Sequence, residues 1–175
     1  MTGNRPHQKK KIPMIVSVTP VDDHRLSIEF GSGSLLDLNM QPRMRTTRHY
    51  DLNNPAVFRA AVTDGSIIIF DPNSVFVPDI FPREAVNMAL RPLTHDAISF
   101  LRVQPLENSR IRLEMATGSV LVLNMENHIR TSRYSDLKDE ELFRSVRADG
   151  ESLIFGDTLQ GDVLRIDEDE LTRLM

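Results

Sequence analysis

Apolar and polar residues alternate along two stretches that share nearly the same pattern, HRLSIEF at residues 24–30 and SRIRLEM at residues 109–115. Alternation with a period of two is typical of a strand with one buried face. Each stretch follows another β-like segment, at 14–21 or 97–106, and precedes a Gly-Ser turn that leads into SLLDLNM or SVLVLNM. The pattern therefore predicts two three-stranded β-meanders.

A short helix is predicted after each meander. Asn54 followed by Pro55 is a sound helix start, an N-cap and then a proline at the first helical position, and Asp139 takes the cap position in the second half. The helices have the sequences PAVFRAAV and EELFRSVR, and each is followed by an Asp-Gly turn and an apolar run, SIIIF or SLIF, that predicts further strands. The apolar residues expected to pack on the meanders are Val57, Phe58 and Ala61, and Leu142, Phe143 and Val146.

The two halves end differently. The pattern predicts a helix that opens at Pro82 in the first half and a closing helix capped by Asp167 in the second. Two homologous domains on a short tether usually pack against each other. We expect either a pseudo-two-fold pair or a sheet continued across the boundary.

The halves are copies of one unit. RTTRHYDL at 45–52 returns as RTSRYSDL at 130–137, and an offset of about 85 residues aligns the chain from 15 to 71 without a gap, with roughly one position in three identical. The fold class expected is α+β, with each domain a β-meander with one covering helix and a following strand pair. The predicted organisation is a flexible basic tail at 1–12, a first repeat domain at 13–90, a linker at 91–96 and a second repeat domain at 97–175.

The order of motifs also resembles a known family. The succession V-x-P, R-L-x-I-x-F, G-S, L-D-L-N, D-L-N-N-P-A-V-F and D-G-S-I-I-I-F, with its second copy ending D-L-K-D-E-E-L-F-R-S-V-R-A-D-G-E-S-L-I-F, is similar to the bacterial domain of unknown function 2442 (DUF2442). The resemblance covers residues 13–174 as a tandem pair. Phe70 and Phe155 stand where many members carry tryptophan. The resemblance implies the fold and, more distantly, an antitoxin-like role beside a small toxin-like partner protein. Some members carry a DNA-binding helix-turn-helix, a pattern that this chain lacks.

Charge and composition exclude several classes of site. The formal net charge of -4 gives no overall field that would steer the chain to nucleic acid or anionic lipid, and the absence of cysteine excludes disulfides, thiol nucleophiles and thiolate metal sites. The polar N-terminus lacks the apolar core of a signal peptide, and no run of about 18 apolar residues exists. We therefore expect a cytoplasmic protein.

The repeated R-T-[TS]-R phrase allows two interpretations. Guanidinium and hydroxyl groups just before a helix start could receive a phosphate, a carboxylate or a partner. Alternatively the arginines pair within each domain, with Glu29 or Asp51 in the first and Glu114 or Asp136 in the second, while the hydroxyls bond to the loop backbone. The candidate anion or partner contacts are Arg45, Thr46, Arg48, Arg130, Thr131 and Arg133.

Catalytic, cofactor-binding and metal-binding residues are not expected. The histidines at 7, 24, 49, 95 and 128 lie in different elements and form no pattern that recurs in both copies, so we expect them on the surface or in turns. No G-x-S-x-G is present. The basic tail, with Arg5, His7 and Lys9 to Lys11, is a solvated arm or a weak, salt-sensitive phosphate contact.

The sequence thus favours a non-catalytic protein-interaction or regulatory module whose partner is another protein, received at an exposed sheet edge or a groove at the domain junction. The alternative is nucleic-acid or small-anion binding through the tail and the two arginine phrases.

Overall fold

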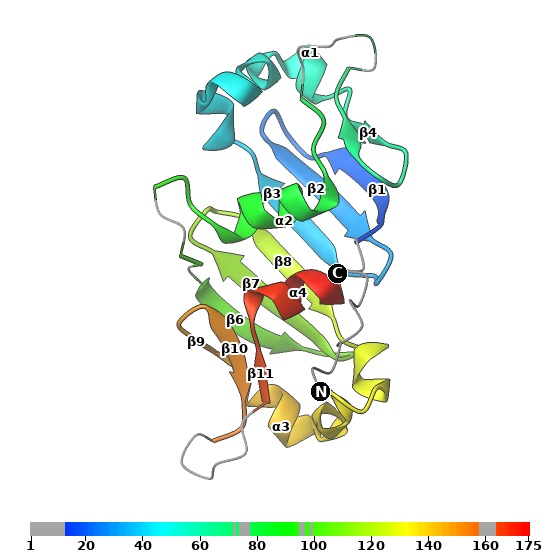
Figure 1. Cartoon of the computed structure of the whole chain (residues 1–175), viewed down its shortest axis with the longest axis vertical. Coiled ribbons are helices and arrows are strands. Elements are labelled where there is room, and N and C mark those ends of the chain that lie inside the picture. The colour runs from blue at the N-terminus through cyan, green and yellow to red at the C-terminus, as the bar shows by residue number, and fades with distance from the viewer. Residues whose placement is uncertain (1–12, 72, 74–77, 95–96, 99, 158–163) are drawn as a thin grey trace, which may run out of the picture.

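The computed structural model describes residues 13–71, 73, 78–94, 97–98, 100–157 and 164–175; the predicted basic tail and part of the linker lie outside the described residues. Its centre is a six-stranded antiparallel sheet to which each half of the sequence contributes one meander, as predicted (Figure 1). Across the sheet the strands are β1 (Ile15–Pro20), β2 (Arg25–Phe30), β3 (Leu35–Asn39), β8 (Val120–Asn124), β7 (Arg110–Met115) and β6 (Phe100–Leu106).

The two meanders meet through β3 and β8. Leu36 lies opposite Leu121 in this register, and the two leucines hold the same position in the repeated sequence. Because a residue that faces its own counterpart lies on a local two-fold axis, the strand order is the same when followed from either edge. The sheet is therefore continuous across the boundary and has a pseudo-two-fold centre.

Reciprocal hydrogen bonds from two buried serines join β3 to β8. The Ser119 hydroxyl oxygen accepts from the backbone N–H of Asn39 at 3.0 Å, and the Ser34 hydroxyl oxygen accepts from the backbone N–H of Asn124 at 3.0 Å. Both serines are fully buried. Buried backbone donors need a partner, so these hydroxyls complete the ladder where the strands diverge.

The two asparagines add a second reciprocal pair. The side-chain amide of Asn39 donates to the Thr117 carbonyl at 3.0 Å, and that of Asn124 donates to the Ser32 carbonyl at 3.2 Å. Gly118 allows this approach because it has a φ of +80° and because a Cβ there would lie 2.8 Å from Asn39 Nδ2. The repeated Gly-Ser and Leu-x-Leu-Asn motifs therefore build the junction between the halves.

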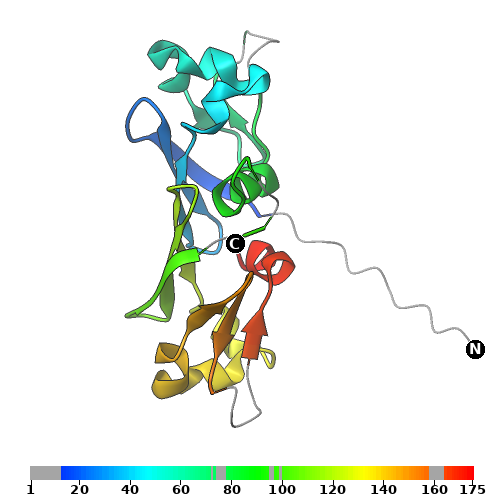
Figure 2. The same ribbon diagram turned by 90° about the vertical axis from the view of Figure 1, so that its left-hand side faces the viewer.

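Helices α2 and α4 lie on one side of the central sheet (Figure 2). Helices α2 and α4 lie across the middle of that face, on either side of the pseudo-two-fold centre, whereas α1 and α3 lie at the two ends of the molecule. The helices are α1 (Pro55–Phe58), α2 (Pro82–Leu90), α3 (Glu140–Arg144) and α4 (Glu168–Leu174). The small sheets comprise β4 (Val62–Thr63) with β5 (Ile68–Ile69), and β9 (Arg147–Asp149), β10 (Ser152–Phe155) and β11 (Leu164–Ile166).

The helix starts are as predicted. The side chains of Asn54, Asp139 and Asp167 accept hydrogen bonds from backbone N–H groups in the first turns of α1, α3 and α4, and Pro82 opens α2. Each of these polar caps satisfies one of the backbone donors that a helix start leaves free.

The predicted helices after the repeated phrase are shorter than expected, and they do not cover the meanders. Both end after little more than one turn because the following residues enter β4 and β9. Phe58 packs on Phe70 and Phe143 on Phe155, with ring centroids 5.8 and 6.1 Å apart. The helices that cover the sheet are instead α2 and α4, whose apolar faces are buried.

The buried side chains form one hydrophobic cluster that extends from Ile15 to Met175 through both halves. The α+β fold class is confirmed. The division into two repeat domains, at 13–90 and 97–175, stays a prediction, because the shared sheet and the shared core give no separation between them.

Removing the junction hydroxyls tests this account of the sheet. We expect Ser34→Ala and Ser119→Ala each to lower the free energy of unfolding by about 1–2 kcal/mol, because each leaves a backbone N–H without its acceptor. Urea unfolding followed by circular dichroism measures the change. Ser66→Ala, at an exposed serine whose hydroxyl makes no hydrogen bond in the described chain, is the matched control. If Ser34→Ala and Ser119→Ala were as stable as Ser66→Ala, the proposed role of the hydroxyls would be contradicted.

Candidate functional site

The second arginine of each repeated phrase is held by an acidic residue of the covering helix. Arg48 lies 2.9 Å from Glu84 of α2, and Arg133 lies 2.9 Å from Glu170 of α4. Each guanidinium also donates to a backbone carbonyl just before that helix, that of Asp79 at 3.5 Å and that of Arg165 at 2.9 Å. The two arrangements are equivalent, so these arginines fasten the covering helix to the preceding 3₁₀ turns.

The acidic partners differ from those expected. Glu29 accepts from the Ser17 hydroxyl, and Glu114 accepts from Arg112, so neither pairs with an arginine of the phrase. The expectation fails because it considered carboxylates near the phrase in sequence or on β2 and β7. The actual partners lie on a helix that returns over the sheet 36 or 37 residues later.

The first arginine of each phrase is exposed. Arg130 lies 3.9 Å from Glu126, a long contact between two exposed surface groups. Arg45 makes no hydrogen bond or ion pair within the described part of the chain. The two phrases lie at opposite ends of the molecule, one beside α1 and the other beside α3 (Figure 1). The structure therefore does not bring the four candidate arginines together.

The threonines of the phrase bond to the backbone. Thr46 Oγ1 donates to the Arg43 carbonyl at 2.6 Å, and Thr131 Oγ1 donates to the His128 carbonyl at 2.7 Å. Each threonine thereby closes the first of two successive 3₁₀ turns. The phrase thus forms 3₁₀ helices rather than the predicted loop: η1 (Arg43–Arg45) and η2 (Thr47–Asn53), and η3 (His128–Arg130) and η4 (Ser135–Lys138).

One position in the phrase is buried in both halves but differs chemically. In the second half, Tyr134 donates its hydroxyl hydrogen to Glu170 at 2.5 Å. Burial, followed by the interaction with Glu170, raises the pKa of Tyr134. Burial alone would raise the pKa of Glu170, but hydrogen bonds from Arg133 and Tyr134 outweigh it and lower that pKa. These three side chains form one ionic cluster under α4.

The first half has His49 at this position. The prediction that the histidines lie on the surface or in turns is wrong here, since His49 is only 5% exposed. Nδ1 lies 3.1 Å from Thr46 Oγ1, and Nε2 is buried without a hydrogen-bond partner among the described residues. Burial, and then the positive charges of Arg48 and Arg43, lower the pKa of His49 to about 4.

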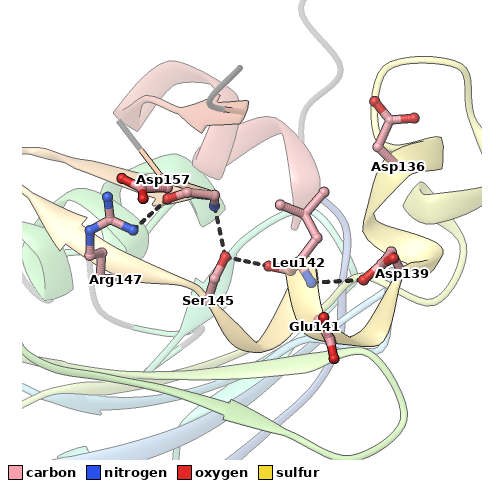
Figure 3. A pocket seen from close by; sticks show the side chains of 8 residues that line it. Asp136, Asp139, Glu141, Leu142, Ser145, Arg147 and Asp157 are labelled. Carbon is pink, nitrogen blue, oxygen red and sulfur yellow. Dashed lines mark hydrogen bonds between the residues drawn. The ribbon is translucent and has the colours of Figure 1, made fainter. Parts of the chain in front are cut away.

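A hollow of about 810 Å³ lies beside the second phrase (Figure 3). Its polar groups hold α3 in place: the Ser145 hydroxyl donates to the Leu142 carbonyl and accepts from Gly156 N–H, and Arg147 donates to the Gly156 carbonyl. Asp139, also in the lining, caps α3. These groups bond to the fold itself, so their role in the structure is to hold α3. Among the described residues, no group of three or more His, Asp or Glu side chains is placed to hold a metal ion.

The face of the central sheet opposite the helices has no described element over it (Figure 2). A β-bulge at the same place in each edge strand adds apolar surface there, with Val16 in β1 and Leu101 in β6 left without a partner in the register. Phe100 and Val103 both pack on the core, so the two residues between them both point outward. Val16 and Leu101 are 59% and 70% exposed.

Apolar residues continue across this open face. Leu35 of β3, 39% exposed, lies opposite half-buried Val122 of β8, at the centre of the sheet. Val21, 60% exposed, lies at a corner of the face opposite Arg25. Ion pairs lie between these apolar positions, Arg25 with Asp37 at 3.3 Å and Arg112 with Glu114 at 3.1 Å.

The two edges of the sheet are less open than the face. Val21 N–H bonds to the Arg25 carbonyl, so the alternation of an antiparallel ladder turns the nitrogen of Pro20 to the free edge of β1. Pro105 holds the matching register position in β6. A proline removes the donor that an added strand would need, and β4 and β9 lie beside the two edge strands. We therefore place the candidate surface on the face rather than at the expected edge.

In comparisons with known proteins, no family model, curated protein or solved structure matches the chain. Within the described chain, no helix is long and apolar enough to cross a membrane.

His49 gives a pH-dependent prediction. Its pKa is lower in the folded than in the unfolded chain, so the unfolded state binds the proton more readily and stability is lost as the pH falls below about 6.5. We expect His49→Tyr to reduce the loss of unfolding free energy between pH 7 and pH 5 by about 1–2 kcal/mol relative to the wild type.

Urea unfolding at the two pH values measures this difference. His24→Gln, at a half-exposed turn histidine, is the control and should lose stability as the wild type does. A His49→Tyr variant with the same pH dependence as the wild type would exclude His49 as the source.

Proposed function

We propose that this chain is a non-catalytic protein-interaction module of regulatory, antitoxin-like type, acting in the cytoplasm, and that it binds its partner on the open face of the central sheet. The observation that carries the proposal is the pair of bulge residues, Val16 and Leu101, exposed at equivalent places on a face that no described element covers. Membership of the DUF2442 family, which would favour an antitoxin-like role, is part of the same proposal.

The chemistry of the face favours a protein partner. Apolar side chains alternate with charged side chains, some of which are paired within the face, such as Arg25 with Asp37. Interfaces between proteins have this composition, with apolar contacts among satisfied polar groups. A face for single-stranded nucleic acid would carry exposed aromatic rings for stacking. Neither Tyr50 nor Phe81, the exposed aromatics of the described chain, belongs to the sheet.

The arginine phrases contribute less to this proposal. Arg48 and Arg133 are engaged with carboxylates of their own chain, so an anion would have to displace Glu84 or Glu170. Surface ion pairs of this kind contribute about 0–1 kcal/mol each, and we expect the Arg48→Ala, Arg133→Ala double variant to fold.

A pull-down of the tagged protein from its native lysate, with and without nuclease, tests the proposal. We expect a protein partner in stoichiometric amount that survives nuclease. The Val16→Asp, Leu101→Asp double variant should lose at least nine-tenths of it, because each change places a carboxylate in the apolar contact. Tyr50→Asp, at a residue 66% exposed away from the face, is the matched control and should retain the partner.

Two results would contradict the proposal. One is nucleic acid as the retained species, lost at moderate salt, which would favour the alternative function. The other is retention of the partner by the face variant together with its loss in the Arg48→Ala, Arg133→Ala variant, which would transfer the binding role to the arginine phrases.

A further inference from the structure

The open face has unequal charge in its two halves. The half from β1 to β3 carries one arginine, Arg25, against Glu29 and Asp37. The half from β6 to β8 carries Arg102, Arg110 and Arg112 against Glu114. Arg102 and Arg110 are exposed and make no ion pair or hydrogen bond in the described chain. The acidic half of one molecule is therefore complementary to the basic half of another.

One row of residues across the face shows this complementarity residue by residue. Strand register places Ser17, Glu29, Leu35, Val122, Arg112 and Gln104 side by side, one from each strand. Consider a second molecule related by a two-fold axis that runs parallel to the strands, between Leu35 and Val122. This axis places the row of one molecule against the same row of the other, in reverse order. Leu35 then faces Val122, Glu29 faces Arg112 and Ser17 faces Gln104.

We propose that the open face binds a second copy of this chain, in a face-to-face dimer with its two-fold axis along the central strands. The inference rests on the proposed function, to which it adds the identity of the partner. The contacts are isologous, as a two-fold interface requires. Each Glu29 faces Arg112 of the other copy, a residue that also pairs with Glu114 of its own chain, and each Leu35 faces Val122. The neighbouring row brings no like charges together, since Asp37 faces Val120, Ser27 faces Glu114 and Thr19 faces Arg102.

Charge selects this stacking over the other two-fold arrangement. A two-fold axis perpendicular to the strands would place each half against the same half of the second molecule. The three arginines of one copy would then face the three arginines of the other. Sheets in face-to-face contact keep their strands within about 30° of each other, which the axis along the strands allows.

The area of the open face determines how tightly two copies are expected to bind. A face of six strands about 4.8 Å apart and about five residues long measures about 29 by 17 Å, or about 500 Å² per copy. The total of about 1,000 Å² is at the low end of specific interfaces. We therefore expect a dissociation constant in the micromolar range, with monomer and dimer both present at ordinary protein concentrations.

Sedimentation equilibrium of the whole chain over a range of concentrations tests the inference. We expect a reversible monomer–dimer equilibrium for the wild type that weakens with salt. Glu29→Arg should weaken it at least tenfold, because the new cation faces Arg112. Arg112→Glu should weaken it as well, and the Glu29→Arg, Arg112→Glu double variant should recover dimerisation to within threefold of the wild type.

Thermal unfolding of each variant shows whether it folds. Glu29 accepts only from the exposed Ser17 hydroxyl in the described chain, so Glu29→Arg gives a folded test even if Arg112→Glu disturbs β7. Additive weakening in the double variant, or a wild type that is monomeric at all concentrations, would overturn the inference. If a monomeric wild type still captures a different protein, and the Val16→Asp, Leu101→Asp variant releases that protein, the proposed function stands without a dimer. If that variant changes neither dimerisation nor the capture of another protein, the dimer and the proposed function both fail.

Discussion

The fold depends on the hydrogen bonds that Ser34 and Ser119 accept across the centre of the sheet. β3 and β8 pair directly at only three positions, and a ladder this short would leave buried backbone donors open where the strands diverge. The serine hydroxyls and the asparagine amides satisfy these donors and acceptors from both sides. Without them the two meanders would each expose an apolar edge strand, which is unfavourable in water.

This junction explains which parts of the repeated sequence are structural. The Gly-Ser and Leu-x-Leu-Asn motifs build the junction, the V-x-P motif places a proline at each outer edge, and the arginine phrase fastens a helix over the sheet. The three repeated motifs therefore have structural roles at the junction, at the edges of the sheet and under the covering helices, and none of these roles needs a ligand. Where the halves differ, as at His49 and Tyr134, the difference lies in the interior and changes stability rather than access.

Much of the fold could be predicted from the sequence, and for identifiable reasons. The strands of the meanders and the caps at Asn54, Asp139 and Asp167 depend on local alternation and on local hydrogen bonding, which the sequence carries directly. The identity of the covering helix and the partners of Arg48 and Arg133 depend on contacts between residues more than 30 positions apart. The local sequence pattern does not report such contacts, which is why Glu84 and Glu170 were not expected as the partners.

The open face was missed for a different reason. Val16 and Leu101 fall within strands that were predicted, and strict alternation would have placed Val16 and Val18 on the same face of the sheet. Only the bulge turns Val16 and Ser17 to the same side, and a bulge adds one residue without a distinctive sequence of its own. Its presence at the same place in both halves means that the duplication carried the irregularity along with the regular strands. A bulge that served only to blunt the edge would work equally well with a polar residue. Both repeats instead carry an apolar side chain at the bulge. These side chains flank a row of residues in which a two-fold axis places acidic opposite basic and apolar opposite apolar groups. A surface that binds a second copy of the same chain requires this arrangement.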